Sequence, residues 1–144
     1  MSDVLSRESI KLGGEAKDRD GAITEAGRLL VASGAVPEAY VDAMHERETS
    51  VSTFMGNGLA IPHGTNEAKG SIRRTAISFV RYDLPLDWNG KQAEFVIGIA
   101  GAGDDHLALL SRIAEIFVDA DRVAELRAAK TSHDVLAVLH GVRV

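Results

Sequence analysis

Apolar residues recur at helical spacing in the first third of the chain. Across residues 20–34 they repeat with the period of an amphipathic helix, which Asp20 is expected to cap and Gly34 to end. A second helix is predicted from Pro37, which suits a first helical turn, to Arg47. The apolar run at residues 59–61 follows these two helices and is predicted to be the end of a strand.

Strand patterns dominate the middle of the chain. Residues 75–82 are rich in β-branched and aromatic residues, and residues 8–13 alternate enough to predict a further short strand. Residues 95–100 are apolar at both odd and even positions, which is typical of a strand covered on both faces. They are the best candidate for a central strand. Residues 83–90, with turn-forming residues, are expected to form a loop that carries Trp88 at its rim.

Helical spacing returns after residues 101–103. Asp104 or Asp105 is expected to cap a helix with one apolar face, formed by Leu109, Leu110, Ile113, Ile116 and Phe117. Asp121 and Ser132 are expected to cap two further helices, over residues 123–129 and 135–139. Helices before and after buried strands predict an α/β fold in which a mixed sheet carries helices on both faces. We expect one domain over residues 1–144, with residues 1–7 as a flexible end.

Composition excludes several classes of function. The 144 residues include no cysteine, so disulfides, thiolate metal sites and thiol catalysis are excluded. A net charge of −5, from 16 basic and 21 acidic residues, argues against a dominant role in nucleic-acid binding. No stretch has the length of an apolar membrane span. The N-terminus has early acidic residues and no apolar signal core, so we expect a cytoplasmic protein.

His63 is the first candidate for chemistry. Pro62 fixes its own φ and favours an extended conformation before it, and Gly64 permits a sharp turn after it. Thr65 is placed to cap a short helix at residues 66–69, whose N–H groups would favour an anion beside the imidazole. The alternative interpretation is a turn whose histidine only packs.

His106 and Arg47 are the other candidates. His106 shares a helix face with Leu110 and Ile113, so it is expected to point inward near the carboxyl end of the central strand, where α/β sheets place ligands. A first-turn histidine bonded to a local carbonyl is the alternative. Arg47 lies at a helix end, where the helix dipole or solvent alone accounts for a cation.

Residues 58–69, GLAIPHGTNEAK, resemble the phosphorylation-site segment of the mannitol/fructose-type IIA domains of the bacterial sugar phosphotransferase system. Residues 40–48 and 96–107 resemble further motifs of the same family, and the mannitol-type version is the most similar. The resemblance runs in order over residues 8–141 and implies the same α/β architecture.

The resemblance also implies a function. In this family, the histidine that matches His63 accepts a phosphoryl group from the carrier protein HPr and passes it to a cysteine of a IIB domain during sugar uptake. The matching second histidine, His106, lies beside it, and Arg47 is expected near the phosphoryl group. Such a site needs a neutral imidazole whose other nitrogen is held by a carbonyl, and donors for the phosphoryl oxygens. We expect these donors to be His106, Arg47 and backbone amides near Gly64.

Two other classes of function stay open. A regulatory module, as in the nitrogen-related members of the family, would use phosphorylation of His63 to change its binding to another protein. A metal-dependent hydrolase would need a ligand set, but residues 45–49 lack the second histidine of the HExxH pattern. No cofactor and no metal are therefore predicted, and the sequence leaves the sugar unspecified.

Overall fold

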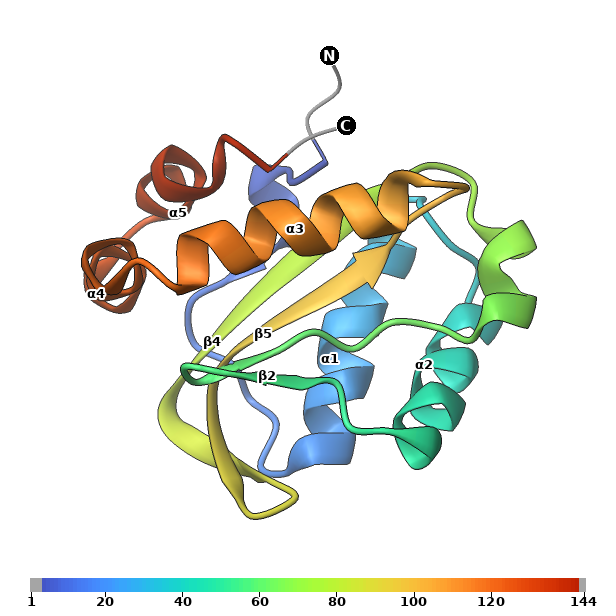
Figure 1. Cartoon of the computed structure of the whole chain (residues 1–144), viewed down its shortest axis with the longest axis horizontal. Helices are drawn as coiled ribbons and strands as arrows, with labels where there is room; N and C mark the ends of the chain where they lie inside the picture. Colours follow the sequence, from blue (N-terminus) through green and yellow to red (C-terminus); the bar gives the residue numbers. More distant parts are fainter. Residues whose placement is uncertain (1–3, 143–144) are drawn as a thin grey trace.

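A computed structural model describes residues 4–142 as a mixed five-stranded sheet covered by helices (Figure 1). The strand order is β1-β4-β5-β3-β2. Neighbouring strands run parallel in β1·β4 and β3·β5 and antiparallel in β4·β5 and β2·β3. The strands are β1 (Ile10–Lys11), β2 (Phe54–Gly56), β3 (Leu59–Ala60), β4 (Ala76–Trp88) and β5 (Lys91–Ala100).

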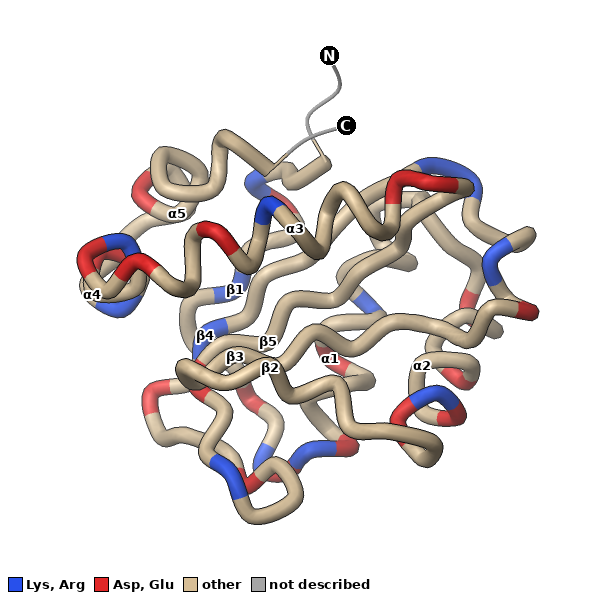
Figure 2. The backbone as a smooth tube through the Cα atoms, viewed as in Figure 1, with Lys and Arg blue, Asp and Glu red and all other residues tan. Residues whose placement is uncertain are grey.

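Helices cover both faces of this sheet, as predicted. α1 (Arg19–Ala32) and α2 (Ala39–Ser50) pack on one face, and α3 (Asp105–Phe117) crosses the other, with α4 (Ala120–Ala128) and α5 (Ser132–Leu139) beyond it (Figure 1). Two short 3-10 helices, η1 (Arg7–Ser9) and η2 (Asn66–Ser71), complete the described chain. Charges of both signs lie on the helices and the hairpin end, whereas β3 is without charge (Figure 2).

β5 is the central strand that the sequence predicts. Its residues Phe95, Ile97 and Ile99 belong to the apolar core under α3, and Val96 and Ala100 belong to the core under α1 and α2. Successive side chains of a strand point to opposite faces, so a strand between two helical layers must be apolar at both parities. The carboxyl end of β5 leads into α3, and this geometry places His106 beside the sheet.

The prediction of a loop at residues 83–90 is wrong. β4 continues through Trp88, whose side chain is fully buried rather than at a rim. The pairing register shifts between Arg81 and Leu86, and this irregularity accommodates Pro85, which has no N–H for the ladder. The real turn is Asn89-Gly90 alone, where both residues have positive φ, as a two-residue hairpin turn requires.

Several predicted helix caps lie later in the sequence than the real ones. A capping side chain must accept the N–H two or three residues ahead, and each helix begins earlier than its apolar pattern does. Gly34 ends α1 with φ +81°, as predicted. The side-chain caps are Asp18 instead of Asp20, Asp119 instead of Asp121, and Thr131 instead of Ser132.

The N-terminal prediction is changed where the structure describes it. Residues 1–3 lie outside the described residues. Val4 and Leu5, which we assigned to a flexible end, are buried in the core under α3 and α5, and Ile77 N–H donates to Val4 O. Only Ile10 and Lys11 of the predicted strand at residues 8–13 pair with β4. None of the helices between residues 4 and 142 is long and apolar enough to cross a membrane.

Candidate functional site

His63 lies beside the carboxyl end of the central strand, where the chain that follows β3 still runs next to β5. It forms an isolated parallel bridge with Ile99, whose N–H donates to Pro62 O at 3.0 Å. The His63 Nδ1 atom lies 2.8 Å from Ile61 O. Because a carbonyl only accepts hydrogen bonds, Nδ1 carries the proton and Nε2 has the free lone pair. The carbonyl partner that we predicted for this imidazole is therefore Ile61 O.

His106 faces His63 from the first turn of α3. The two ring centroids are 4.7 Å apart, at an interplanar angle of 53°. This approach requires Gly101, because a Cβ atom there would lie 2.5 Å from His106 Cα. Asp104 and Asp105 make no capping bond to α3; instead Asp105 accepts from the Thr75 hydroxyl at 2.6 Å. That hydroxyl also accepts from Ala102 N–H at 3.0 Å, which fixes the turn that leads to His106.

Arg47 lines the same cavity as the two histidines. The cavity has a volume of about 240 Å³ and is lined by Tyr40, Arg47, Ser50, His63, Gly64, Thr65, Asn66, Glu67, Lys69, Ile72, Gly101 and His106. Arg47 Nη1 donates to Val51 O at 2.7 Å, which holds the guanidinium in place. The structure therefore brings all three predicted site residues together.

Both histidines are held in the neutral state. Burial lowers the pKa of His63 from its ordinary value, and the Arg47 charge lowers it further, against the opposing effects of the Ile61 hydrogen bond and Glu48. Burial is also the main reason that the pKa of His106 falls to about 4, with His63, Lys69 and Arg47 adding to the effect. At pH 7 the site offers an unprotonated nitrogen beside positive charge.

Two residues of the site, Lys69 and Tyr40, are not predicted from the sequence pattern. Lys69, on η2, lines the cavity, and its charge acts on His106. Tyr40 is buried, and its hydroxyl donates to Ile99 O and accepts from Gly64 N–H, both at 2.9 Å. The spacing of α2 shows that Tyr40 faces the core, but its partners are 24 and 59 residues away, so local pattern does not reveal them.

Tyr40 also corrects two expectations about the turn. Gly64 is not needed for a positive φ; a Cβ atom there would lie 2.7 Å from the Tyr40 ring. Its amide donates to Tyr40, so that N–H is not a free donor for an anion. Thr65 stands at the N-cap position of η2 but makes no side-chain capping bond.

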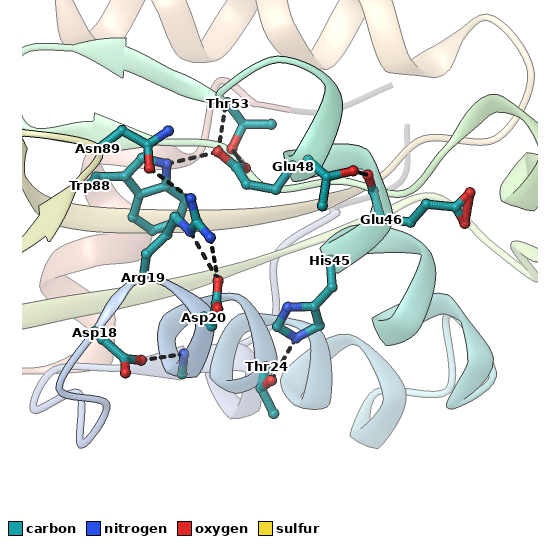
Figure 3. A network of polar contacts seen from close by, with 12 residues as sticks. Asp18, Arg19, Asp20, Thr24, His45, Glu46, Glu48, Thr53, Trp88 and Asn89 are labelled. Carbon is teal, nitrogen blue, oxygen red and sulfur yellow. Dashed lines mark hydrogen bonds and ion pairs between the residues drawn. The ribbon is translucent and has the colours of Figure 1, made fainter.

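Two other histidines, His45 and His140, do not line the cavity. His45 bonds the Thr24 hydroxyl at 2.8 Å and so links α2 to α1 (Figure 3). His140 bonds Ala137 O within its own turn. Between residues 4 and 142 there is no cluster of three or more His, Cys, Asp or Glu residues arranged to hold a metal ion.

Known proteins resemble this chain along almost its whole length. A mannitol-specific phosphotransferase enzyme IIA component from Halalkalibacterium halodurans is 47% identical over 136 residues, which is 94% of each chain. Enzyme IIA-mannitol of Escherichia coli, solved in complex with phosphorylated enzyme IIB-mannitol, superposes with a TM-score of 0.88 at 32% identity, over 95% of this chain and 97% of that one. The nitrogen regulatory protein IIA-Ntr of Neisseria meningitidis superposes with a TM-score of 0.82 at 26% identity, over 94% and 96%.

A match to a family model shows the family of the chain. The model described as "Phosphoenolpyruvate-dependent sugar phosphotransferase system, EIIA 2" matches residues 3–141. This agrees with the resemblance seen in the sequence motifs and with the fold shared with the solved structures. The chain therefore belongs to the EIIA 2 family of the phosphoenolpyruvate-dependent sugar phosphotransferase system.

Proposed function

We propose that this chain is a mannitol-type phosphocarrier in which His63 accepts a phosphoryl group from phospho-HPr and passes it to a IIB domain. The observation that carries the proposal is the state of His63: Nδ1 is bonded to Ile61 O, so the lone pair of Nε2 is free in a cavity beside His106 and Arg47. The proposed carrier domain is the whole chain, residues 1–144.

The transfer follows from this geometry. The Nε2 lone pair of His63 attacks phosphorus while the bond from phosphorus to the donor nitrogen breaks, and the proton stays on Nδ1, where it is donated to the Ile61 carbonyl. Phosphoryl transfer is catalysed mainly by positioning and by donors around the equatorial oxygens. Arg47 supplies N–H groups beyond the one bonded to Val51 O, His106 supplies a ring N–H, and Lys69 supplies an ammonium group.

The second step reverses the roles. A cysteine thiolate of the IIB domain attacks phosphorus, and the bond to Nε2 breaks, which returns the lone pair to His63. The low pKa of His63 favours this step, because a weakly basic imidazole is a good leaving group. Phosphorylated enzyme IIB-mannitol is the partner in the related Escherichia coli complex, and this supports a IIB domain of a membrane permease as the acceptor. We place the carrier in the cytoplasm, where it meets HPr.

A regulatory module is the alternative. IIA-Ntr of Neisseria meningitidis shares the fold at 26% identity, against 47% for the mannitol-specific relative, so the comparison favours sugar transport. The two functions differ in the acceptor. Incubation of the phosphorylated chain with a mannitol-type IIB domain should move the label to that domain within seconds to minutes, whereas a purely regulatory module keeps its label.

The phosphorylation step is tested with phosphoenolpyruvate, enzyme I and HPr. Wild type should gain one acid-labile phosphoryl group by intact mass, and His63→Ala should gain none. His133→Ala, a histidine outside the cavity, is the matched control and should be labelled like wild type. His106→Ala should keep its acceptor but be labelled more slowly, since its N–H is a positioning donor. Full labelling of His63→Ala would disprove the assignment.

A further inference from the structure

Glu48 is a buried carboxylate one residue beyond Arg47, and the transfer mechanism above does not use it. It is 5% exposed and accepts three hydrogen bonds: from Thr53 N–H at 3.0 Å, from Thr53 Oγ1 at 2.5 Å and from Trp88 Nε1 at 2.9 Å (Figure 3). None of the ion pairs between residues 4 and 142 includes it. A buried charge held only by neutral donors is costly, so it needs a reason beyond packing.

The contacts of Glu48 lead to His63. Thr53 is held by its N–H and its hydroxyl, and its carbonyl accepts from Ile61 N–H at 3.0 Å. The carbonyl of Ile61 in turn accepts from His63 Nδ1 at 2.8 Å. An unbroken series of hydrogen bonds therefore connects the buried carboxylate to the nitrogen that fixes the tautomer of the imidazole.

The same segment also holds Arg47. Its Nη1 donates to Val51 O, two residues before Thr53. On the other side, the fully buried Trp88 at the end of β4 donates to Glu48 and anchors it to the sheet. One carboxylate thus fixes a short segment, residues 51–53, to which Arg47 is hydrogen-bonded directly and His63 is connected through Ile61.

We propose that Glu48 is a positioning residue that fixes residues 51–53 and so sets the tautomer of His63 and the direction of Arg47. Its effect on phosphoryl transfer rests on the proposed function, but its effect on the His63 ring does not. The role is distinct from that of His106, because Glu48 is outside the residues that line the cavity and positions the His63 ring through Thr53 and Ile61.

The charge of Glu48 adds a second effect that packing alone would not produce. It raises the pKa of His63, against burial and the charge of Arg47. The other titratable or charged groups that line the cavity are His106, itself neutral, Glu67, Lys69 and Tyr40. Removing the charge should therefore lower the pKa of His63 further.

The test compares Glu48→Gln with Glu46→Gln. Both changes remove one negative charge from α2, but Glu46 is exposed and its side chain makes none of these contacts (Figure 3). The amide keeps the shape of the side chain and one acceptor. In Glu48→Gln we expect phosphorylation by phospho-HPr to slow by roughly ten- to a hundred-fold, the size of effect that small misplacements of reacting groups produce. Glu46→Gln should match wild type.

NMR supplies the readouts that separate positioning from stability. In Glu48→Gln the ¹⁵N shifts of His63 should show loss of the single Nδ1–H tautomer and a lower pKa. The indole N–H signal, which belongs to Trp88 as the only tryptophan, should move as its charged acceptor is lost. Thr53→Val, which removes one donor to Glu48, should shift the same signals less and serves if Glu48→Gln does not fold.

The outcomes of these experiments either support or overturn the positioning role of Glu48. An unchanged His63 tautomer and pKa in a folded Glu48→Gln variant would overturn the proposal, whatever the transfer rate. A rate loss equal to the loss of folded protein, with unchanged His63 shifts, would also overturn it. If wild type itself accepts no phosphoryl group, the proposed function fails, and the His63 shifts still decide the positioning role.

Discussion

Removing the Tyr40 hydroxyl should weaken both the fold and the site. Tyr40→Phe keeps the ring and opens no cavity, but it takes the partner from two backbone groups, Gly64 N–H and Ile99 O. Leaving a buried polar group without a partner costs about 1–3 kcal/mol, and a hydrogen bond contributes about 0.5–1.5 kcal/mol net. For two groups, the loss of stability would be about 2–6 kcal/mol. Because the adjoining cavity admits water to Gly64, we expect a loss at the lower end, about 2 kcal/mol.

The functional consequence follows from what the hydroxyl joins. It ties the residue after His63 to the end of β5, and β5 leads through Gly101 to His106. Without it, the 4.7 Å approach of the two rings loses one of its constraints. Phosphorylation should therefore slow in a variant that is still folded, since a loss of about 2 kcal/mol leaves a typical domain with positive stability.

Urea unfolding and the rate of phosphorylation test this pair of effects, with Tyr82→Phe as the matched control. Tyr82 is also buried, but its hydroxyl donates to Glu25 at 2.6 Å, away from the cavity. Both variants should lower the unfolding midpoint with an unchanged m-value. Only Tyr40→Phe should slow transfer. A stability loss below about 0.5 kcal/mol, or equal transfer rates in the two variants, would refute the reasoning.

Three further results are expected. Gly101→Ala should lose about 1–3 kcal/mol through overpacking against the backbone of α3 and slow phosphorylation as His106→Ala does, whereas Gly13→Ala, with nothing within 4 Å of its new Cβ, should do neither. The pKa of His106 is about 4 in the folded chain and near 6.5 in the unfolded chain, so the unfolded state binds more protons between these pH values. The free energy of unfolding should therefore fall as pH falls from 6.5 toward 4, and it should fall less in His106→Gln. Because the pKa of His63 is also lowered below its ordinary value, less than half of the chain should carry a protonated His63 at pH 6.5, so the rate of its phosphorylation should fall by less than half from this cause as pH falls from 8 to 6.5.

The sequence predicts the fold wherever burial on both faces leaves a clear pattern. β5 and α3 follow from their apolar positions, and these two elements place His106. The pattern fails at β4, because Pro85 and two aspartates resemble a loop, although a register irregularity lets the strand pass them to Trp88. Whether such a stretch is loop or strand depends on its partner strand, which local pattern does not contain.

The site is predictable in its chemistry and less so in its supports. His63, His106 and Arg47 could be named from type, position and resemblance, and the structure brings them together. Tyr40 could not, because its role depends on contacts between distant residues. The requirement for glycine at position 64 also depends on a distant residue. A glycine beside a turn suggests backbone freedom, whereas Gly64 makes room for the aromatic ring of Tyr40.

The position of the phosphoryl group tests the central claim most directly. Chain labelled with ¹⁵N in its histidines, phosphorylated by phosphoenolpyruvate, enzyme I and HPr, should show one modified ring in its NMR spectrum. We predict a bond from phosphorus to Nε2 of His63, with the proton still on Nδ1 and directed to Ile61 O. A phosphoryl group on Nδ1 of His63, on any other histidine, or on none would contradict it.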